Sequence, residues 1–283
     1  MMVEKDTSYK VSSYIRTFVL IALTIIFIFP ILLVLMNSFK SRLYVSTIPF
    51  ALPLGDMFVG LENYINGLTT SGFFKAFLRS VWISVMGVGV IILCTSMTAW
   101  YIVRVKDKFT KALYYVFVFS MIVPFQMVMY TLTFVVTSVY FDNIFGIVLV
   151  YLGFGAGLAV FMFCGFVKSI PLEVEEAATI DGCNPLQTYF LIVFPMLKPT
   201  AITVAILQAM WIWNDYLLPY LILGSDHKTV PVAIQLAMQG AYGSTDYGGF
   251  MAMLVVSIIP IIAFYISSQK YIIKGVIAGA VKG

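Results

Sequence analysis

The chain has 283 residues, of which 61% are hydrophobic and only 11% are charged, and its mean hydropathy is +0.99. One soluble core cannot bury so much apolar surface, so the composition excludes a soluble globular protein and predicts an integral membrane protein. The net charge of +4 requires no nucleic-acid partner, because the excess of lysine and arginine is a signal of membrane topology.

Six stretches are long and apolar enough to cross the bilayer as helices, each needing about 20 residues for roughly 30 Å of hydrocarbon. The first is too long for a signal-peptide core and has no small-residue cleavage pattern, so we expect it to remain as a membrane helix. The six predicted spans lie near 14–36, 79–103, 112–136, 144–167, 200–223 and 250–268. The predicted fold is an all-α integral membrane protein with an N-terminal segment (1–13), a six-helix transmembrane domain (14–268) and a C-terminal tail (269–283).

The distribution of lysine and arginine predicts the orientation of these spans. With a cytoplasmic N-terminus, the inner side holds most of the 17 basic residues: Lys5, Lys10, Arg16, Arg104, Lys106, Lys108, Lys111, Lys168, Lys198, Lys270, Lys274 and Lys282. The other basic residues lie mostly in or beside one long outer loop, where the rule is weakest. Both termini are therefore expected in the cytoplasm.

In the third and fifth predicted spans, polar residues are candidates for a translocation path. Asn214 and Asp215, beside Trp213, fall near the outer third of the fifth span, where an ionised carboxylate costs about 2.5–3.5 kcal/mol unless it faces protein or water. Gln126 follows Pro124 in the third span, where a broken helix could expose carbonyl groups to a cavity. A polar pair that packs two helices, or an interfacial aromatic belt, would give the same pattern.

Between the fourth and fifth spans lies a polar cytoplasmic segment, 168–199. It carries four acidic residues within nine positions: Glu173, Glu175, Glu176 and Asp181. Pro171 and the early carboxylates favour the start of a short helix, and Gly182 can provide the positive-φ residue that ends it. Asn184 and Pro185 suit the start of a second helix. The sequence thus predicts a helix-turn-helix.

Both predicted helices have a characteristic face. The second would align four apolar side chains: Leu186, Tyr189, Phe190 and Val193. In the first helix, Val174, Ala177 and Ala178 share a face on which small residues permit close approach of another helix. An amphipathic helix on lipid headgroups is the alternative, but its acidic face argues against that, because such helices favour Lys and Arg.

No residues suggest catalysis, a metal site or nucleotide binding. Cys94 and Cys164 lie inside spans and Cys183 in the polar segment, so neither a disulfide framework nor a metal-ligand spacing can be assembled. No GxxxxGK[ST] run occurs, so any energy from ATP must come through another subunit.

The run EAATIDGCNPLQTYFLIVFP resembles the EAA loop of ABC-importer membrane subunits, with Phe194 where the family usually has Leu. The matching positions are Glu176, Ala177, Ala178, Gly182, Ile192 and Pro195. Further runs are similar to the maltose-type carbohydrate permeases: GLENYINGL (60–68), MTAWYIVRVK (97–106) and the ending QKYIIKGVIAGAVKG (269–283), which is typical of the G-type partner. At the entry to the second span, this chain has Arg79 and Ser80 where the family often has Asn-Ser.

The resemblance implies a transport subunit, not an enzyme, that forms half of a heterodimeric pore with an F-type permease. It also implies two cytoplasmic ATPase subunits that use ATP and Mg, an external sugar-binding protein and a bacterial or archaeal cell membrane. No cofactor would bind this chain itself. The EAA loop, including Asp181, would dock on the ATPase, and the tail with Lys282 and Gly283 would add a second contact.

Two other classes of function compete with this interpretation. A secondary transporter or channel would be expected to show inverted repeats or buried ion-coupling charges, and the sequence has neither. An intramembrane enzyme would need clustered His, Asp or Glu near the midplane, where Asp215 is nearly alone.

Overall fold

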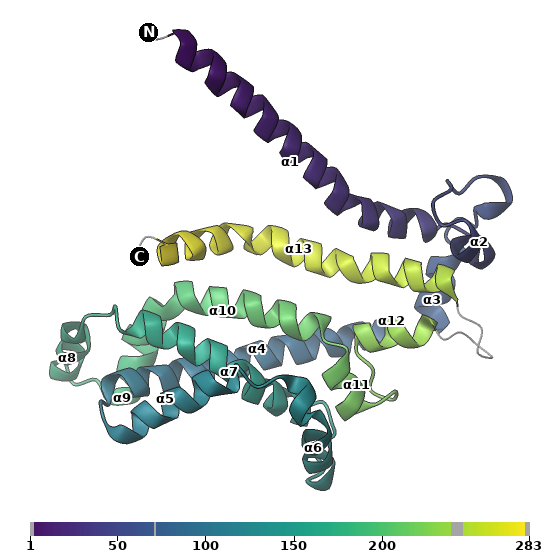
Figure 1. The fold of residues 1–283 in the computed structure, drawn as a ribbon. Helices are drawn as coiled ribbons and strands as arrows, with labels where there is room; N and C mark the ends of the chain where they lie inside the picture. Colours follow the sequence, from purple (N-terminus) through teal and green to yellow (C-terminus); the bar gives the residue numbers. More distant parts are fainter. Residues whose placement is uncertain (1–2, 71, 239–245, 281–283) are drawn as a thin grey trace. The chain divides into compact units, whose positions relative to one another are not determined.

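The computed structural model describes the backbone of residues 3–70, 72–238 and 246–280, and within these ranges it contains helices and no strands (Figure 1). The chain divides into two compact units, residues 1–73 with 234–259 and residues 74–233 with 260–283. The predicted all-α membrane fold is confirmed.

The first unit contains the N-terminal membrane helix and a folded loop region. Its elements are α1 (Val3–Asn37), α2 (Arg42–Thr47), the 3₁₀ turn η1 (Gly55–Met57), α3 (Glu62–Thr70), the end of α12 (Val230–Met238) and the first half of α13 (Tyr247–Ala280). Within α1, the span Ser12–Asn37 is apolar on all sides and its most hydrophobic stretch is unburied. Such a helix suits a lipid environment.

The loop that follows α1 is organised around a buried lysine. Lys40 is fully buried, and its Nζ donates to the carbonyl oxygens of Ile48 at 3.1 Å and Pro49 at 3.0 Å. Burial lowers the pKa of Lys40, and the two carbonyls partly compensate for the lost hydration. Asn63 binds the same turn by donating to the backbone oxygens of Ser38 and Lys40.

The second unit contains most of the remaining membrane helices. Its elements are α4 (Phe73–Arg104), α5 (Lys108–Ser120), α6 (Phe125–Ser138), α7 (Gly146–Val167), α8 (Leu172–Ile180), α9 (Pro185–Gln187), the π-helical η2 (Thr188–Val193), α10 (Phe194–Asn214) and α11 (Leu217–Leu223). The most buried of its spans is α7, which packs against α5 and α10. Figure 1 shows α8 at one end of this unit and α6 and α11 at the other.

Glycines allow α7 to approach its neighbours closely. A Cβ on Gly155 would lie 2.7 Å from Ile91 Cδ1 and 2.9 Å from Gln208 Oε1, and one on Gly157 would lie 2.7 Å from the Phe117 carbonyl. Gln208 is buried in the middle of α10 and donates to the Gly155 carbonyl at 3.1 Å. Small residues allow close helix approach at these two positions, as in membrane bundles generally.

Four of the six predicted spans are found with nearly the predicted bounds: Ser12–Asn37, Phe73–Arg104, Gly146–Val167 and Tyr247–Gln269. The third is not one straight helix, because α5 and α6 meet at an angle of 105°. Pro124 precedes α6 with an extended conformation, which explains a break at this point. The number of membrane helices in the described chain is therefore five, or six with the bent pair counted as one span.

The fifth span also differs from expectation. The fifth span runs over Pro185–Asn214 instead of 200–223, and α11 is a separate short helix. The last membrane span ends at Gln269, next to the predicted start of the tail, and α13 itself continues as far as Ala280. Lys282 and Gly283 lie outside the described residues.

Candidate functional site

The first helix of the polar segment, α8, ends in the predicted way. Gly182 has φ +87°, and its amide donates to the Thr179 carbonyl at 3.0 Å. The next amide, of Cys183, donates to the Ala178 carbonyl at 2.9 Å. This pair of hydrogen bonds is the Schellman motif, in which a left-handed glycine closes a helix. Asp181 is the C-cap residue, and its position at the turn is thereby fixed.

The following residues also begin a helix as predicted. The Asn184 side chain accepts a hydrogen bond from the Gln187 amide at 2.9 Å, and the Gln187 side chain accepts one from the Asn184 amide at 2.9 Å. This reciprocal pair is a capping box, with Pro185 at the first helical position.

We expected this second helix to be separate from the fifth span. Instead, it runs without a break through η2 into α10. Ile192 lies in the π-helical turn, and Pro195 is exposed at the point where the π-helical turn passes into α10. The π-helical turn also changes the helix register, so Tyr189 is buried while Leu186 and Phe190 are exposed, contrary to the predicted common face.

A contact between α8 and α4 that the sequence did not predict holds α8 in place. Arg104, the last residue of α4, donates from Nη2 to Glu175 Oε1 at 2.6 Å and from Nε to the same oxygen at 3.0 Å. Trp100, one turn earlier, donates from Nε1 to the other oxygen of Glu175 at 2.9 Å. Arg104 Nη2 also donates to the Ile170 carbonyl just before α8 at 3.0 Å. We call the side chains of Trp100, Arg104 and Glu175 the α4–α8 clamp.

Glu175 is 7% exposed, so the clamp is a largely buried ion pair whose carboxylate also accepts a hydrogen bond from the neutral Trp100 indole. A buried carboxylate of this kind is tolerated only when its oxygens are paired. The sequence gives only a weak signal that Arg104 and Glu175 pair with each other, because Glu175 stands among three other acidic residues and Arg104 among several basic ones.

The end of α4 also holds the second arm of the segment. The Tyr189 hydroxyl lies 2.6 Å from Ser96 Oγ, and the Tyr189 ring packs on Trp100 with centroids 5.6 Å apart. Tyr189 is completely buried. Both arms of the helix-turn-helix are therefore attached to one membrane helix.

The exposed surface of α8 differs from the predicted one at one position. Ala178 is buried and faces the protein, whereas Glu176 and Ala177 are exposed. Ile180, which was not predicted, is 86% exposed in the last turn of α8. Helical periodicity explains why Ala178 is buried, because Ala178 is three positions from the clamp residue Glu175 and shares its inward face.

The residues predicted for the translocation path are not gathered at one place. Asp215 lies outside the span, just after α10 ends, where it accepts from Tyr151 Oη at 3.1 Å and from the Leu218 amide at 3.3 Å. Asn214 donates to the Met210 carbonyl one turn earlier at 2.7 Å. Gln126 is exposed in the first turn of α6, and its side chain makes no hydrogen bond with the described residues.

Trp213, by contrast, lines an apolar cavity of about 410 Å³. Its ring lies edge-on to Phe77 with centroids 5.8 Å apart. Ser84, on α4, lines the same cavity, and its buried Oγ has no hydrogen-bond partner among the described residues. An apolar hollow with an unsatisfied hydroxyl and an indole ring is a suitable surface for a partly apolar, hydroxylated ligand.

Comparison with known proteins identifies the family. A model for the binding-protein-dependent transport system inner membrane component matches residues 91–278, which is more than half of the chain. The chain belongs to this family. It is thus a multi-pass permease subunit of an ABC importer and a transport subunit instead of an enzyme.

Named permeases resemble the chain over almost its whole length. The probable starch degradation products transport system permease protein AmyC of Thermoanaerobacterium thermosulfurigenes is 38% identical over 273 residues, covering 96% of this chain and 98% of that protein. The multiple sugar-binding transport system permease protein MsmG of Streptococcus mutans is 35% identical over 263 residues, covering 91% and 93%. The resemblance to sugar permeases seen in the sequence is confirmed.

A solved structure supports the fold independently. A crystal structure of a bacterial ABC transporter involved in the import of the acidic polysaccharide alginate matches with a TM-score of 0.77 at 21% identity, covering 93% of this permease and 97% of that chain.

Proposed function

We propose that this permease forms half of a carbohydrate pore and that α8 transmits the movement of a cytoplasmic ATPase into α4. The α4–α8 clamp is the observation that carries the proposal. An effector shifts a two-state equilibrium only through its different affinities for the two states, so a docking helix must be rigidly connected to the spans that it moves. Two hydrogen bonds from Arg104 and one from Trp100 provide that connection.

The exposed side of α8 is the proposed contact with the ATPase. Glu176, Ala177 and Ile180 would meet its surface, and Asp181 and Gly182 would keep the turn in shape. Ala178 is proposed as a packing residue under this surface. For Ile192 and Pro195, at the start of the continuous fifth span, we propose a role in passing movement from the turn into α10.

The proposed assembly contains this permease, an F-type permease, two ATPase subunits that hold ATP and Mg, and an external sugar-binding protein. The family description, which names a binding protein, supports the last of these. So does a structural neighbour with a TM-score of 0.64, a bacterial alginate ABC transporter in complex with a pentasaccharide-bound periplasmic protein. The tail, with Lys282 and Gly283, is proposed as a second ATPase contact.

The substrate is proposed to be a carbohydrate, in agreement with the names of AmyC, MsmG and the diacetylchitobiose permease NgcG of Streptomyces coelicolor. Trp213 is the best-supported contact along the path, because a pyranose ring stacks its apolar face on aromatic rings and the cavity also contains Ser84. Asn214, Asp215 and Gln126 are proposed to line the path on the side of α11 and α6.

Purification of the tagged permease from its own host, followed by mass spectrometry of co-eluting proteins, tests this proposal. We expect a second permease and an ATPase, and a crosslink to the ATPase from Ile180→Cys on the exposed end of α8. Recovery of the permease alone or as a homo-oligomer, without a crosslinked ATPase, would contradict it. Reconstituted complexes should then take up labelled oligosaccharides only with ATP and binding protein.

A further inference from the structure

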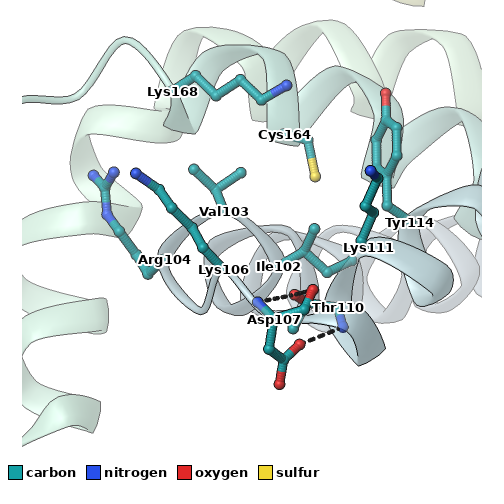
Figure 2. Close-up of a pocket in the computed structure, with 10 residues that line it drawn as sticks. All are labelled: Ile102, Val103, Arg104, Lys106, Asp107, Thr110, Lys111, Tyr114, Cys164 and Lys168. Carbon is teal, nitrogen blue, oxygen red and sulfur yellow. Dashed lines mark hydrogen bonds between the residues drawn. The ribbon is translucent and has the colours of Figure 1, made fainter.

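A basic cavity lies between the ends of α4, α5 and α7, and the proposed function does not use it. Its volume is about 550 Å³, and Arg104, Lys106, Lys111 and Lys168 are among the residues that line it. In Figure 2, these side chains reach the cavity from different segments: the end of α4 and its following turn, α5, and the residue after α7.

The lysines of this cavity form no ion pair within the part of the chain that the structure describes. None of Lys106, Lys111 and Lys168 forms an ion pair with a carboxylate in the described part of the chain, and Lys168 instead lies over the Tyr114 ring at 5.9 Å. Arg104 is paired with Glu175 through Nε and Nη2, but its Nη1 makes no hydrogen bond to a described residue. Positive groups that converge on a hollow without compensation favour an anionic ligand.

The one carboxylate in the lining, Asp107, does not neutralise these lysines. It accepts a hydrogen bond from the Thr110 amide at 2.7 Å and caps α5, and Figure 2 shows its carboxylate directed away from Lys168. This hydrogen bond lowers the pKa of Asp107, so the carboxylate stays ionised in its capping role. The Thr110 amide at the start of α5 is thus already used, and the basic side chains are the groups proposed to hold a ligand.

The position of the cavity indicates the source of the anion. Arg104 ends one membrane span and Lys168 directly follows another, so the cavity lies at the boundary between hydrocarbon and water. Ile102, Val103 and Tyr114 add apolar surface to its lining. From there α5 continues with exposed apolar side chains: Tyr115, Val116 and Phe119. A headgroup phosphate with attached acyl chains matches both parts, whereas a free phosphate matches only the basic one.

We propose that this cavity binds the phosphate of an anionic membrane lipid. Basic pockets between membrane helices are suited to such headgroups. Because Arg104 belongs to both the cavity and the α4–α8 clamp, the bound phosphate would lie next to the connection between α8 and the membrane helices.

The test compares two variants of equal charge in the purified complex, each reconstituted in discs that contain phosphatidylcholine and phosphatidylglycerol. Lys111→Gln with Lys168→Gln removes two lysines of the cavity. Lys108→Gln with Lys198→Gln removes two exposed lysines that do not line it. Native mass spectrometry then reports how much of each lipid stays bound.

We expect the unmodified complex and the Lys108/Lys198 variant to retain phosphatidylglycerol in preference to phosphatidylcholine. The Lys111/Lys168 variant should bind phosphatidylglycerol about 25-fold more weakly, because each lysine near an anionic surface contributes a factor of about five. Equal retention by both variants, or no preference for phosphatidylglycerol, would overturn the proposal.

A second experiment distinguishes a bound lipid from a bound free anion. Inorganic phosphate is added to the same discs. Displacement of phosphatidylglycerol by millimolar inorganic phosphate would assign the cavity to a soluble anion and overturn the lipid proposal. Persistence of the bound lipid would support it. The readout needs neither ATP hydrolysis nor sugar, so its result is independent of the proposed transport function.

Discussion

Glu175 is the residue whose surroundings most directly connect α8 with the membrane helices. Both of its oxygens are hydrogen-bonded to α4, and it is almost completely buried. Its neighbour Glu173 in the same turn is exposed. The two glutamates therefore form a matched pair with which the effect of the clamp can be separated from that of charge.

We predict that Glu175→Gln lowers the stability of the complex by about 3 kcal/mol, since it leaves Arg104 without its partner in a largely buried position. ATP-driven sugar uptake should fall by about tenfold, within the range of about 5–150-fold typical of energetic coupling between sites. Uptake by proteoliposomes and thermal unfolding of the complex measure the two effects.

Glu173→Gln is the control and should leave both quantities nearly unchanged. In Arg104→Gln with Glu175→Gln, the combined loss should be smaller than the sum of the single losses, because the two residues share one interaction. Strict additivity would argue against the clamp.

Gly182 is important for its backbone and for its position on the exposed turn. Its φ is +87°, and a Cβ there would meet no atom within 4 Å, so substitution causes strain without a clash. Gly182→Ala should cost about 1–2 kcal/mol locally and reduce uptake moderately. Gly182→Asp adds a negative charge beside Asp181 and should abolish ATP-dependent uptake while the protein remains inserted.

The measurement is ATP-dependent uptake by cells or proteoliposomes with matched amounts of complex. Gly165→Ala serves as the control, because Gly165 has ordinary helical geometry and open space around its Cβ position. Normal transport by Gly182→Asp would refute a coupling role for this turn.

At the scale of elements, the packing of α7 depends on where its glycines face. Gly155 contacts α4 and α10, whereas a Cβ on Gly153, two residues earlier, would meet nothing within 4 Å. The sequence presents both in the same run of alternating glycines, so their different roles follow from the helix orientation alone.

We predict that Gly155→Ala destabilises the complex by about 1–3 kcal/mol, because the added methyl group overpacks against Ile91 and Gln208. Gly153→Ala should be neutral or slightly stabilising, since alanine has the higher helix propensity. Thermal unfolding in detergent compares the two variants, and equal effects would contradict the close approach of α7 and its neighbours.

At the scale of the whole molecule, the orientation in the membrane is a proposal that rests on the positive residues. It can be tested after replacement of the native Cys94, Cys164 and Cys183. Ile180→Cys, on α8, should react with an impermeant maleimide only in opened cells, and Phe50→Cys, in the loop after α1, should react in intact cells or spheroplasts. Both side chains are strongly exposed in the permease. Because the ATPase is proposed to cover Ile180, the labelling is done with the permease expressed without the ATPase, so that accessibility to the reagent depends on the side of the membrane. The reverse labelling pattern would show that the permease has the opposite orientation in the membrane.

Much of the fold could be predicted because its determinants are local. Hydropathy identifies apolar helices long enough to cross the bilayer, and four spans were found with nearly the predicted bounds. The turn at Gly182 and the helix start at Asn184 depend on neighbouring residues only, so the sequence predicted both. The EAA pattern was likewise sufficient to indicate the family to which the chain belongs.

The contacts between helices were decided only by the tertiary structure. Arg104 and Glu175 are 71 positions apart, and no local pattern distinguishes them from other charged residues near the membrane. Apolar helix faces look alike in sequence whether they meet lipid or protein, because the bilayer interior is as apolar as a protein core. For that reason the inward position of Ala178, the end of α10 before Asp215 and the basic cavity beside the clamp became visible only once the helices were packed together.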